Sequence, residues 1–373
     1  MILKIKEVEG KKDLHRFIHL PEQIHQGHQN WVPPLYVDDW QYFNPEKNKS
    51  FSYCDTILLL AYRGDQVAGR IMGIINHRYN ESHHENDARF CWPECRNEPD
   101  VAEALLNKVE EWARSKGMEK IVGPLGFSDK DPQGFLVEGF DEPVAIATNC
   151  NWPYMIDLIQ ANNYVKKIDL VVYKINLPDK IPEIYEKIST RSLNNHQLTV
   201  LEFEKKSQMK PMIRPVLSLV NETFMDIYGF DPMSGKEMDD LAARYMPILD
   251  PRFVKCILNN KNELVAFILG MPDMSKGIIR SRGYLFPFGI IHILRSAKKT
   301  KQLNLMLGAI RKDFRNIGLD AVMAIKMFGS AKKAGFEIVD SHLEMEDNYK
   351  VRAEMERFGG IVYKKYRIYQ KNL

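Results

Sequence analysis

The chain has 373 residues, enough for two domains of ordinary size, and its 45% hydrophobic and 27% charged residues exclude a wholly disordered protein. Its formal net charge of +3 is too small to indicate a nucleic-acid partner. The sequence shows no apolar run of spanning length, no signal-peptide pattern and no CxxC pair among its five cysteines, so we expect a cytoplasmic protein.

Two segments of the first half are unusual in composition. Residues 30–45, NWVPPLYVDDWQYFNP, are rich in aromatic residues and proline, and are expected either to cover a cleft or to pack as ordinary core. Residues 76–87 contain His77, His83 and His84, but a flexible polar turn does not hold ligands at metal-binding spacing. We therefore expect no metal.

Two patterns of the first half recur in the same order in the second. Residues 57–73 and 254–270 each read as an apolar hairpin, with turns at Gly-Asp and Asn-Lys-Asn. Residues 101–124 and 319–342 each read as a helix that ends at a glycine and passes into a short apolar strand. Repeats of this length indicate a duplicated structural unit.

A third pair completes the repeat. Residues 153–175 and 349–370 each read as a short helix followed by a strand. The offset is 218 residues for the long-helix pair and 197 for this last pair, so the first half has 21 extra residues (218 − 197) within 128–152. That stretch is rich in Gly, Pro and Asp and predicts a loop. A connector containing a short helix is expected at 178–198.

Residues 283–294, GYLFPFGIIHIL, are almost wholly apolar. The pattern predicts a buried strand between charged loops. The alternative is a membrane-surface or acyl-chain-binding element, which would bring peripheral membrane contact and a lipid substrate. The flanking basic residues are Arg280, Arg282, Arg295, Lys298, Lys299 and Lys301.

A strand at 303–310 runs into RKDFRNIGLD, residues 311–320, and then into a helix. Free N–H groups and the dipole at a helix N-terminus favour a phosphate, and Gly318 lets the backbone approach it closely. Positive charge comes from Arg311, Lys312 and Arg315. The loop therefore predicts an anion site, although Asp320 adds a carboxylate that could instead simply stabilise the helix start.

The corresponding loop of the first half is a natural comparison. At the offset of 218, Gly318 falls on Asp100 and the loop becomes CRNEPDV. Because Glu98 and Asp100 would repel a pyrophosphate, we expect the second half to be the one that binds it.

The second half resembles the GNAT superfamily of N-acetyltransferases. Residues 311–320 resemble its [RQ]-x-x-G-x-[GA] pyrophosphate loop, the strand EIVDSHLEMEDN ends at Asn348 as its Glu-Asn strand does, and a helix then reaches Gly359. The first half, especially GPLGFSDKDPQGFLVEGFD, and the closing YKKYRIYQK resemble a group of uncharacterised bacterial members.

The resemblance implies an α/β (α+β) fold of two tandem GNAT-like domains, each a mixed, mainly antiparallel sheet flanked by helices. The first would cover residues 1–177 and be degenerate for coenzyme A; the second would cover 199–373, after the connector at 178–198.

The implied reaction is transfer from acetyl-CoA or a longer acyl-CoA to an amine, which is either a small molecule or an amino-lipid. The pyrophosphate would bind the loop, and a backbone N–H around Leu307 to Ala309 would hold the thioester carbonyl. The candidate cofactor residues are Leu307, Gly308, Ala309, Ile310, Arg311, Lys312, Arg315, Asn316, Ile317 and Gly318.

The candidate catalytic residues are Glu344, Glu346, Asn348 and Tyr363. The two glutamates alternate with apolar residues and share a strand face, so either is a candidate base; the alternative is that both simply face solvent. The superfamily's general acid, a tyrosine about seven residues after the Asn, is replaced by Met355, and Tyr363 is a candidate substitute. The departures at Met355 and Asp320 leave open a non-catalytic ligand-binding or interaction module.

The insertion at 128–152 has two interpretations. It is either a loop over a cleft, in which Asp129, Asp131 and Glu138 bind a cationic amine, or a structural loop between packed repeats.

Overall fold

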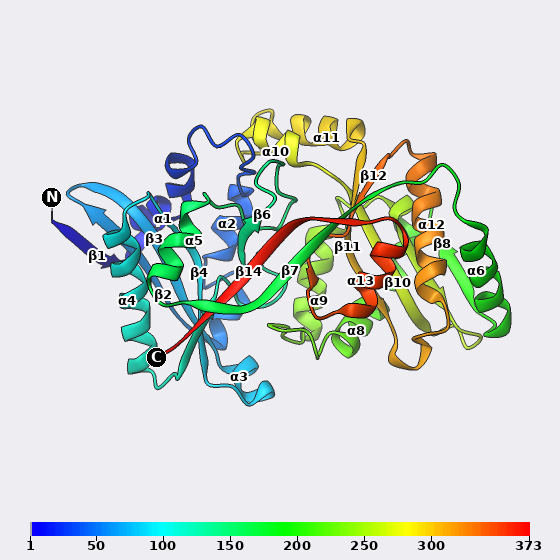
Figure 1. Ribbon diagram of the computed structural model, residues 1–373, viewed down its shortest axis with the longest axis horizontal. Coiled ribbons are helices and arrows are strands. Elements are labelled where there is room, and N and C mark those ends of the chain that lie inside the picture. Colours follow the sequence, from blue (N-terminus) through cyan, green and yellow to red (C-terminus); the bar gives the residue numbers. More distant parts are fainter. Residues whose placement is uncertain (1) are drawn as a thin grey trace.

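The computed structural model describes residues 2–373, and its strands form one continuous sheet (Figure 1). The order of neighbours is β1-β2-β3-β4-β5-β14-β7-β12-β11-β10-β9-β8, with β13 beside β7 and β6 beside β14. The strands are β1 Leu3–Glu7, β2 Cys54–Arg63, β3 Gln66–Asn76, β4 Asp87–Cys95, β5 Lys120–Gly123, β6 Phe135–Glu138, β7 Val165–Asn176, β8 Thr199–Glu202, β9 Val254–Leu258, β10 Leu264–Pro272, β11 Gln302–Ile310, β12 Ile338–Asp340, β13 Glu344–Met345 and β14 Ile361–Asn372.

Helices cover both faces of this sheet (Figure 1). They are α1 Gly10–Ile24, α2 Tyr36–Tyr42, α3 His77–His83, α4 Pro99–Ser115, α5 Tyr154–Ala161, α6 Glu183–Asn195, α7 Lys206–Met209, α8 Ile213–Thr223, α9 Gly235–Tyr245, α10 Ser275–Ser281, α11 Gly289–Lys299, α12 Leu319–Lys333 and α13 Tyr349–Arg357. Within residues 2–373, none of them has both the length and the apolar character that a bilayer-crossing helix needs.

The elements predicted from the repeat are present in both halves. The two hairpins are β2–β3 and β9–β10, the two long helices are α4 and α12, and the last pairs are α5–β7 and α13–β14. In α4, Val101, Leu105 and Val109 recur at helical spacing and are buried against β2 and β3. The connector contains α6, as expected, and this helix packs on α12.

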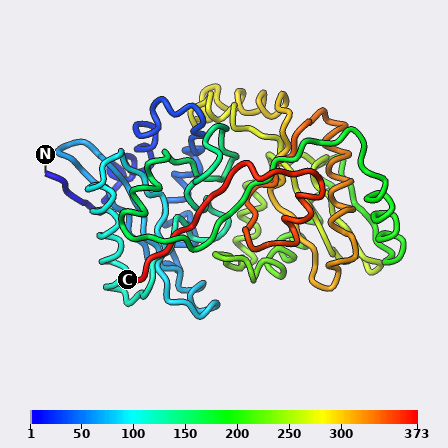
Figure 2. Tube along the Cα trace, viewed as in Figure 1, coloured from blue at the N-terminus to red at the C-terminus, as the bar shows by residue number. Residues whose placement is uncertain are grey.

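The last strands of the two halves are exchanged. β14, at the C-terminus, lies between β5 and β7, and β7 in turn pairs with β12 of the second half. Figure 2 shows the red C-terminal segment running from the second half across to the first. Tyr369 is opposite Gly123, and Ile338 is opposite Asn176. The sheet is therefore continuous across the boundaries that the sequence repeat suggests.

The prediction of a buried strand at 283–294 is wrong. This stretch is the turn between α10 and α11 together with the start of α11. Ile290, Ile293 and Leu294 recur at helical rather than alternating spacing, and Arg282, with a φ of 51°, ends α10 in the left-handed conformation.

The expected strand through EIVDSHLEMEDN is broken in two. β12 ends at Asp340 and pairs with both β11 and β7, whereas β13 contains only Glu344 and Met345 and pairs with β7. His342 lies between them with a φ of 59°, which turns the chain. Glu344 and Glu346 therefore do not lie on one regular strand.

Candidate functional site

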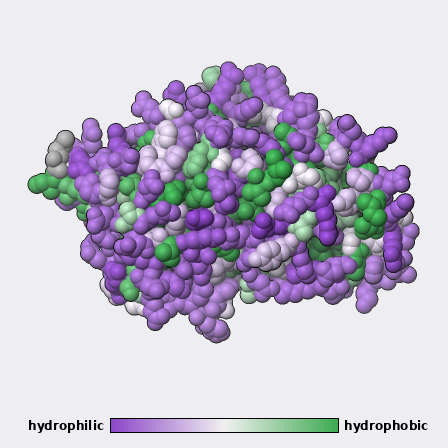
Figure 3. Space-filling view, in the orientation of Figure 1, coloured by the Kyte–Doolittle hydropathy of each residue, from purple (hydrophilic) through white to green (hydrophobic). Residues whose placement is uncertain are grey.

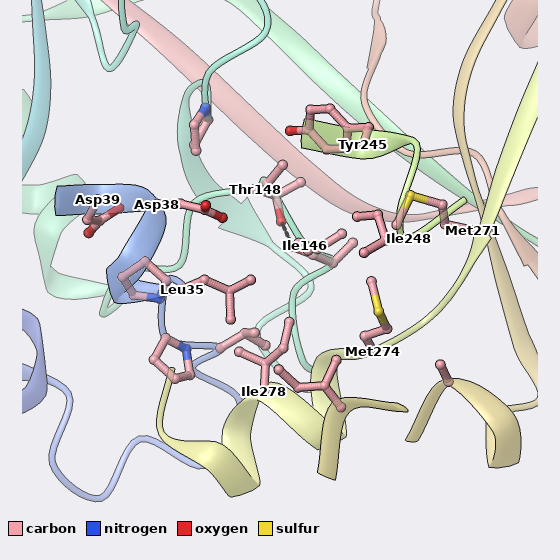
Figure 4. A pocket seen from close by; sticks show the side chains of 18 of the residues that line it. Leu35, Asp38, Asp39, Ile146, Thr148, Tyr245, Ile248, Met271, Met274 and Ile278 are labelled. Carbon is pink, nitrogen blue, oxygen red and sulfur yellow. Dashed lines mark hydrogen bonds between the residues drawn. The ribbon is translucent and has the colours of Figure 1, made fainter. Parts of the chain in front are cut away.

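A cavity of about 1010 Å³ lies between the two halves (Figure 4). Its walls come from the segment that leads into α2, from the insertion, from the chain after α9, and from β10 with α10 and α11. This volume is at the upper end of the ~300–1,000 Å³ typical of ligand sites, so the cavity suits a large ligand.

The cavity wall is mainly apolar. Figure 4 shows several of the apolar side chains around the same space. They are Leu35, Ile146, Ile248, Met271, Met274 and Ile278. Such a lining favours a hydrocarbon chain, because burying apolar surface is favourable in proportion to the area removed from water.

Two adjacent acids of α2 belong to this site. Asp38 points toward the cavity in Figure 4, and burial raises the pKa of its carboxyl group, an effect that Arg244 opposes. Asp39 is buried, and burial raises its pKa to about 7 although Arg70 favours its charged form. Within residues 2–373, one oxygen of Asp39, Oδ2, is buried without a hydrogen-bond partner.

A buried ion pair lies close to Asp39. Arg70 donates to the carbonyl of Phe17 at 2.6 Å and approaches Glu94 at 3.2 Å. Burial alone would raise the pKa of Glu94, but Arg70 and His25 outweigh it and hold that pKa below its usual value. The pair therefore places one charge of each sign at this end of the cavity, with Arg70 buried and Glu94 partly buried.

The strand β11 has a free edge and a bulge. It pairs with β12 only from Gln302 to Asn304, so this edge is unpaired beyond Asn304. On the other side Leu305 is opposite Gly270 and Leu307 is opposite Leu269, which leaves Met306 as an extra residue without a ladder partner.

The bulge joins the strand edge to the cavity. The side chain of Met306 packs in the apolar cluster that contains Met271 and Met274, both of which line the cavity. The free backbone N–H of a bulge residue is a candidate donor to a thioester oxygen. The sequence places this donor one to three residues later, at Leu307 to Ala309.

In the predicted phosphate loop, each basic side chain has a protein partner. Arg311 contacts Asp313 at 2.8 Å and Glu263 at 3.4 Å. Lys312 contacts Asp226 at 3.2 Å, and Arg315 donates through Nε to the carbonyl of Ile310 at 3.2 Å. Lys312 and Arg315 are nevertheless exposed.

The start of α12 has no side-chain cap. Gly318 is its N-cap, with a φ of 87°, and a Cβ placed there would be 2.7 Å from Cγ2 of Ile188 in α6. Asp320 does not cap the helix; together with burial it raises the pKa of Glu354 in α13. Backbone donors are therefore left at this terminus, beside two carboxylates.

The two predicted bases have different surroundings. Glu344 is partly buried, and burial raises its pKa to about 8. Glu346 accepts hydrogen bonds from the backbone N–H of Asp169 at 3.0 Å and from Lys166 at 2.8 Å. Glu344 is not among the described residues that line the cavity, and Glu346 joins β7 to the chain after β13.

The other predicted catalytic residues lie on α13 and β14. Tyr363 donates a hydrogen bond to the buried carboxylate of Asp340, and burial raises the pKa of both groups. Asn348 is exposed at the start of α13, and its side chain makes no cap hydrogen bond.

Of the three acids predicted in the insertion, Asp131 lines the cavity and accepts a hydrogen bond from Tyr42 at 3.0 Å. Asp129 is 3.5 Å from Lys130, and Glu138 pairs with Lys365 at 2.6 Å on an exposed part of the sheet. Within residues 2–373, no group of His, Cys, Asp or Glu is arranged to hold a metal ion.

The sequence did not single out Asp38, Asp39, Arg70 or Met306. Both aspartates belong to the aromatic segment at 30–45, for which a cleft-covering role was one expectation, and this segment does line the cavity. No sequence pattern marks the bulge, because a bulge depends on pairing with a distant strand.

The repeated units, the exchanged last strands and the splayed edge of β11 define a tandem GNAT fold. A tandem GNAT protein from the clavulanic acid biosynthesis pathway superposes with a TM-score of 0.55 at 10% identity, covering 100% of this chain and 98% of its own. No family model matches the sequence.

Two curated proteins are similar over nearly their whole length. Bacterial ceramide synthase of Caulobacter vibrioides (strain NA1000 / CB15N) is 26% identical over 378 residues, which cover 100% of this chain and 98% of the relative. Protein YghO of Escherichia coli (strain K12) is 24% identical over 381 residues, which cover 98% of this chain and 94% of the relative.

Proposed function

We propose that the protein transfers an acyl group from an acyl-CoA to the primary amine of a long-chain amino-lipid. The observation that carries this proposal is the apolar cavity with the carboxylate of Asp38 pointing into it. The carboxylate suits the cationic head of an amino-lipid, and the apolar wall suits its hydrocarbon tail. The name of the Caulobacter relative supports the proposal, since a ceramide is the amide of a long-chain amino alcohol.

The acyl donor would lie along β11. The uncapped start of α12 and the exposed Arg315 would bind the pyrophosphate, and the pantetheine arm would follow the free edge of the strand. Met306 precedes Arg311 by five residues, roughly 17 Å at about 3.4 Å per strand residue. The thioester would then lie at the bulge, next to the apolar cluster of the cavity.

The chemistry requires a neutral amine. An alkyl ammonium is protonated near pH 7, and an apolar site lowers its pKa. Asp38 would hold the ammonium head, and Glu344, which does not line the cavity and has a pKa of about 8, would accept the proton through water. The nitrogen attacks the thioester carbonyl while the N–H of Met306 binds the oxygen. The C–S bond then breaks, and the proton that the nitrogen loses as the amide forms passes to the coenzyme A thiolate.

Thiol release with acyl-CoA and an 18-carbon amino alcohol tests this function, with mass spectrometry to identify the amide. We expect one amide per thiol released, and at least tenfold less product from Asp38→Asn. Thiol release without amide, or the same rate in the absence of the amine, would show that the chain is not an N-acyltransferase.

A second candidate function is a lipid-binding module without catalysis. It is favoured by the ion pairs of Arg311 and Lys312 and by the carboxylates of Asp320 and Glu354 beside the predicted phosphate loop. Calorimetric titration with coenzyme A separates the two functions: binding supports the transferase, and no heat at millimolar coenzyme A supports the module.

A further inference from the structure

The turn between α10 and α11 exposes a group of large apolar side chains. Phe286 is 84% exposed, Phe288 is 65% exposed and Leu294 is 54% exposed, and Tyr284, Ile290 and Ile291 are also exposed. In Figure 3 most of the visible face is hydrophilic, but hydrophobic atoms also reach the upper edge, where α10 and α11 lie in Figure 1. We call this surface, from Tyr284 to Leu294, the apolar tip.

The flanks of the apolar tip are basic. Residues 274–300 contain six Lys and Arg and no Asp or Glu. All six side chains are exposed, and within residues 2–373 none of them forms an ion pair. They are Lys276, Arg280, Arg282, Arg295, Lys298 and Lys299. Within the tip, Tyr284 donates a hydrogen bond to Glu22 at 2.6 Å.

The apolar tip is continuous with the cavity. Leu285, in the turn between α10 and α11, and Ile293, in α11, both line the cavity. Ile290 and Leu294 both line the cavity and are exposed, so they lie where the cavity reaches the surface. A hydrocarbon chain leaving the cavity here would meet the apolar tip rather than a polar surface.

We propose that the apolar tip docks on the surface of an anionic phospholipid bilayer. Phe286 and Phe288 would enter the boundary between headgroups and acyl chains, and the six basic side chains would lie near the phosphates. This orientation places the cavity opening against the bilayer. The inference goes beyond the proposed acyl transfer and does not depend on it, because docking requires neither acyl-CoA nor an amine.

Sedimentation of the full chain with vesicles tests this inference, without any substrate present. One set of vesicles is phosphatidylcholine alone and the other contains phosphatidylglycerol. We expect at least tenfold tighter binding to the anionic vesicles, lost at least tenfold in Phe286→Ser/Phe288→Ser and in Arg282→Gln/Lys299→Gln. The matched control is Val165→Ser/Ile184→Ser, at two residues that are each 59% exposed on other elements and should leave binding unchanged.

Melting followed by circular dichroism shows whether each variant is folded. Absence of wild-type binding to either vesicle, or equal binding by Phe286→Ser/Phe288→Ser, would overturn the inference. So would a dimer in light scattering that this variant converts to a monomer, because the apolar tip would then be covered by a second copy. Since no substrate is used, each of these results is separate from any failure of acyl transfer.

Discussion

Asp38 and Asp39 follow one another in α2 but present their carboxylates to different surroundings. Asp38 points into the cavity, whereas Asp39 is buried near Arg70. Successive residues of a helix point about 100° apart. Both acids line the cavity, but Asp38 is only partly buried and Asp39 is buried in the cavity wall. The two acids should respond differently to the same substitution.

The substitution Asp39→Asn should change how stability depends on pH. The folded pKa of about 7 lies above the unfolded value of about 4, so the contribution of Asp39 is full below pH 4 and is lost as the pH rises to 7. The loss is at most about 4 kcal/mol, at 1.36 kcal/mol per pH unit. Urea unfolding between pH 4 and pH 7 should show the wild type losing stability relative to Asp39→Asn.

The control for this experiment is Asp38→Asn. It should reduce acyl transfer, but it should change the pH dependence of stability less than Asp39→Asn does. A wild type and an Asp39→Asn variant with parallel stability profiles would mean that Asp39 is ionised in the folded protein.

Glu344→Gln and Glu346→Gln form a matched pair. If Glu344 is the base, its pKa of about 8 makes the wild-type rate rise with pH up to about pH 8. Glu344→Gln should then lower kcat by roughly 10²–10⁴-fold and abolish this rise. Glu346→Gln removes the charge that contacts Lys166, so it should cost about 1 kcal/mol of stability and leave kcat within a fewfold. An unchanged pH–rate profile in Glu344→Gln would exclude it as the base.

Two exposed cations of the predicted phosphate loop should contribute to coenzyme A affinity. We expect Lys312→Gln and Arg315→Gln each to raise the Kd about fivefold to tenfold, the equivalent of about 1 kcal/mol, because each loses a charge near the diphosphate. Calorimetry measures this directly. Arg96→Gln, in the corresponding loop of the first half, is the control and should bind like the wild type; equal losses in all three variants would indicate a nonspecific charge effect.

Tyr363→Phe should act on stability. The hydroxyl proton of Tyr363 is used in the bond to Asp340, and its loss leaves a buried carboxylate with one partner fewer. The expected cost is about 1–3 kcal/mol in urea unfolding, with kcat changed only a fewfold. A hundredfold fall in kcat at unchanged stability would instead assign Tyr363 the general-acid role suggested by the sequence.

The repeat could be predicted because its signals are local. The helix α4 buries one face at helical spacing, α4 and α12 both end at glycines, and both hairpins have turn residues between apolar strands. The exchange of β7 and β14 could not be predicted, since each strand alone would fit either half of the sheet. For 283–294, an apolar run of this length is compatible with either a buried strand or a helix. In the structure several of its large apolar side chains are exposed, which a buried strand would not allow.

The candidate site was predicted less completely than the fold. Loop 311–320 and Glu344 were proposed from their resemblance to known motifs, and both stay predictions. The cavity was not, because its walls come from segments as distant as Leu35, Ile146 and Ile278, which only the folded chain brings together. The ion pairs of Arg311 and Lys312 were also unforeseen, since their partners Glu263 and Asp226 are far away in the sequence.

The most direct test of the central claim is the chain-length dependence of amine acylation, measured as kcat/KM for an 18-carbon and a 4-carbon amine with one acyl-CoA. The apolar cavity predicts at least a hundredfold preference for the long amine, reduced at least tenfold by Met274→Trp, which narrows the cavity. Equal kcat/KM for the two amines, or an unchanged preference in Met274→Trp, would contradict a lipid acceptor held in this cavity.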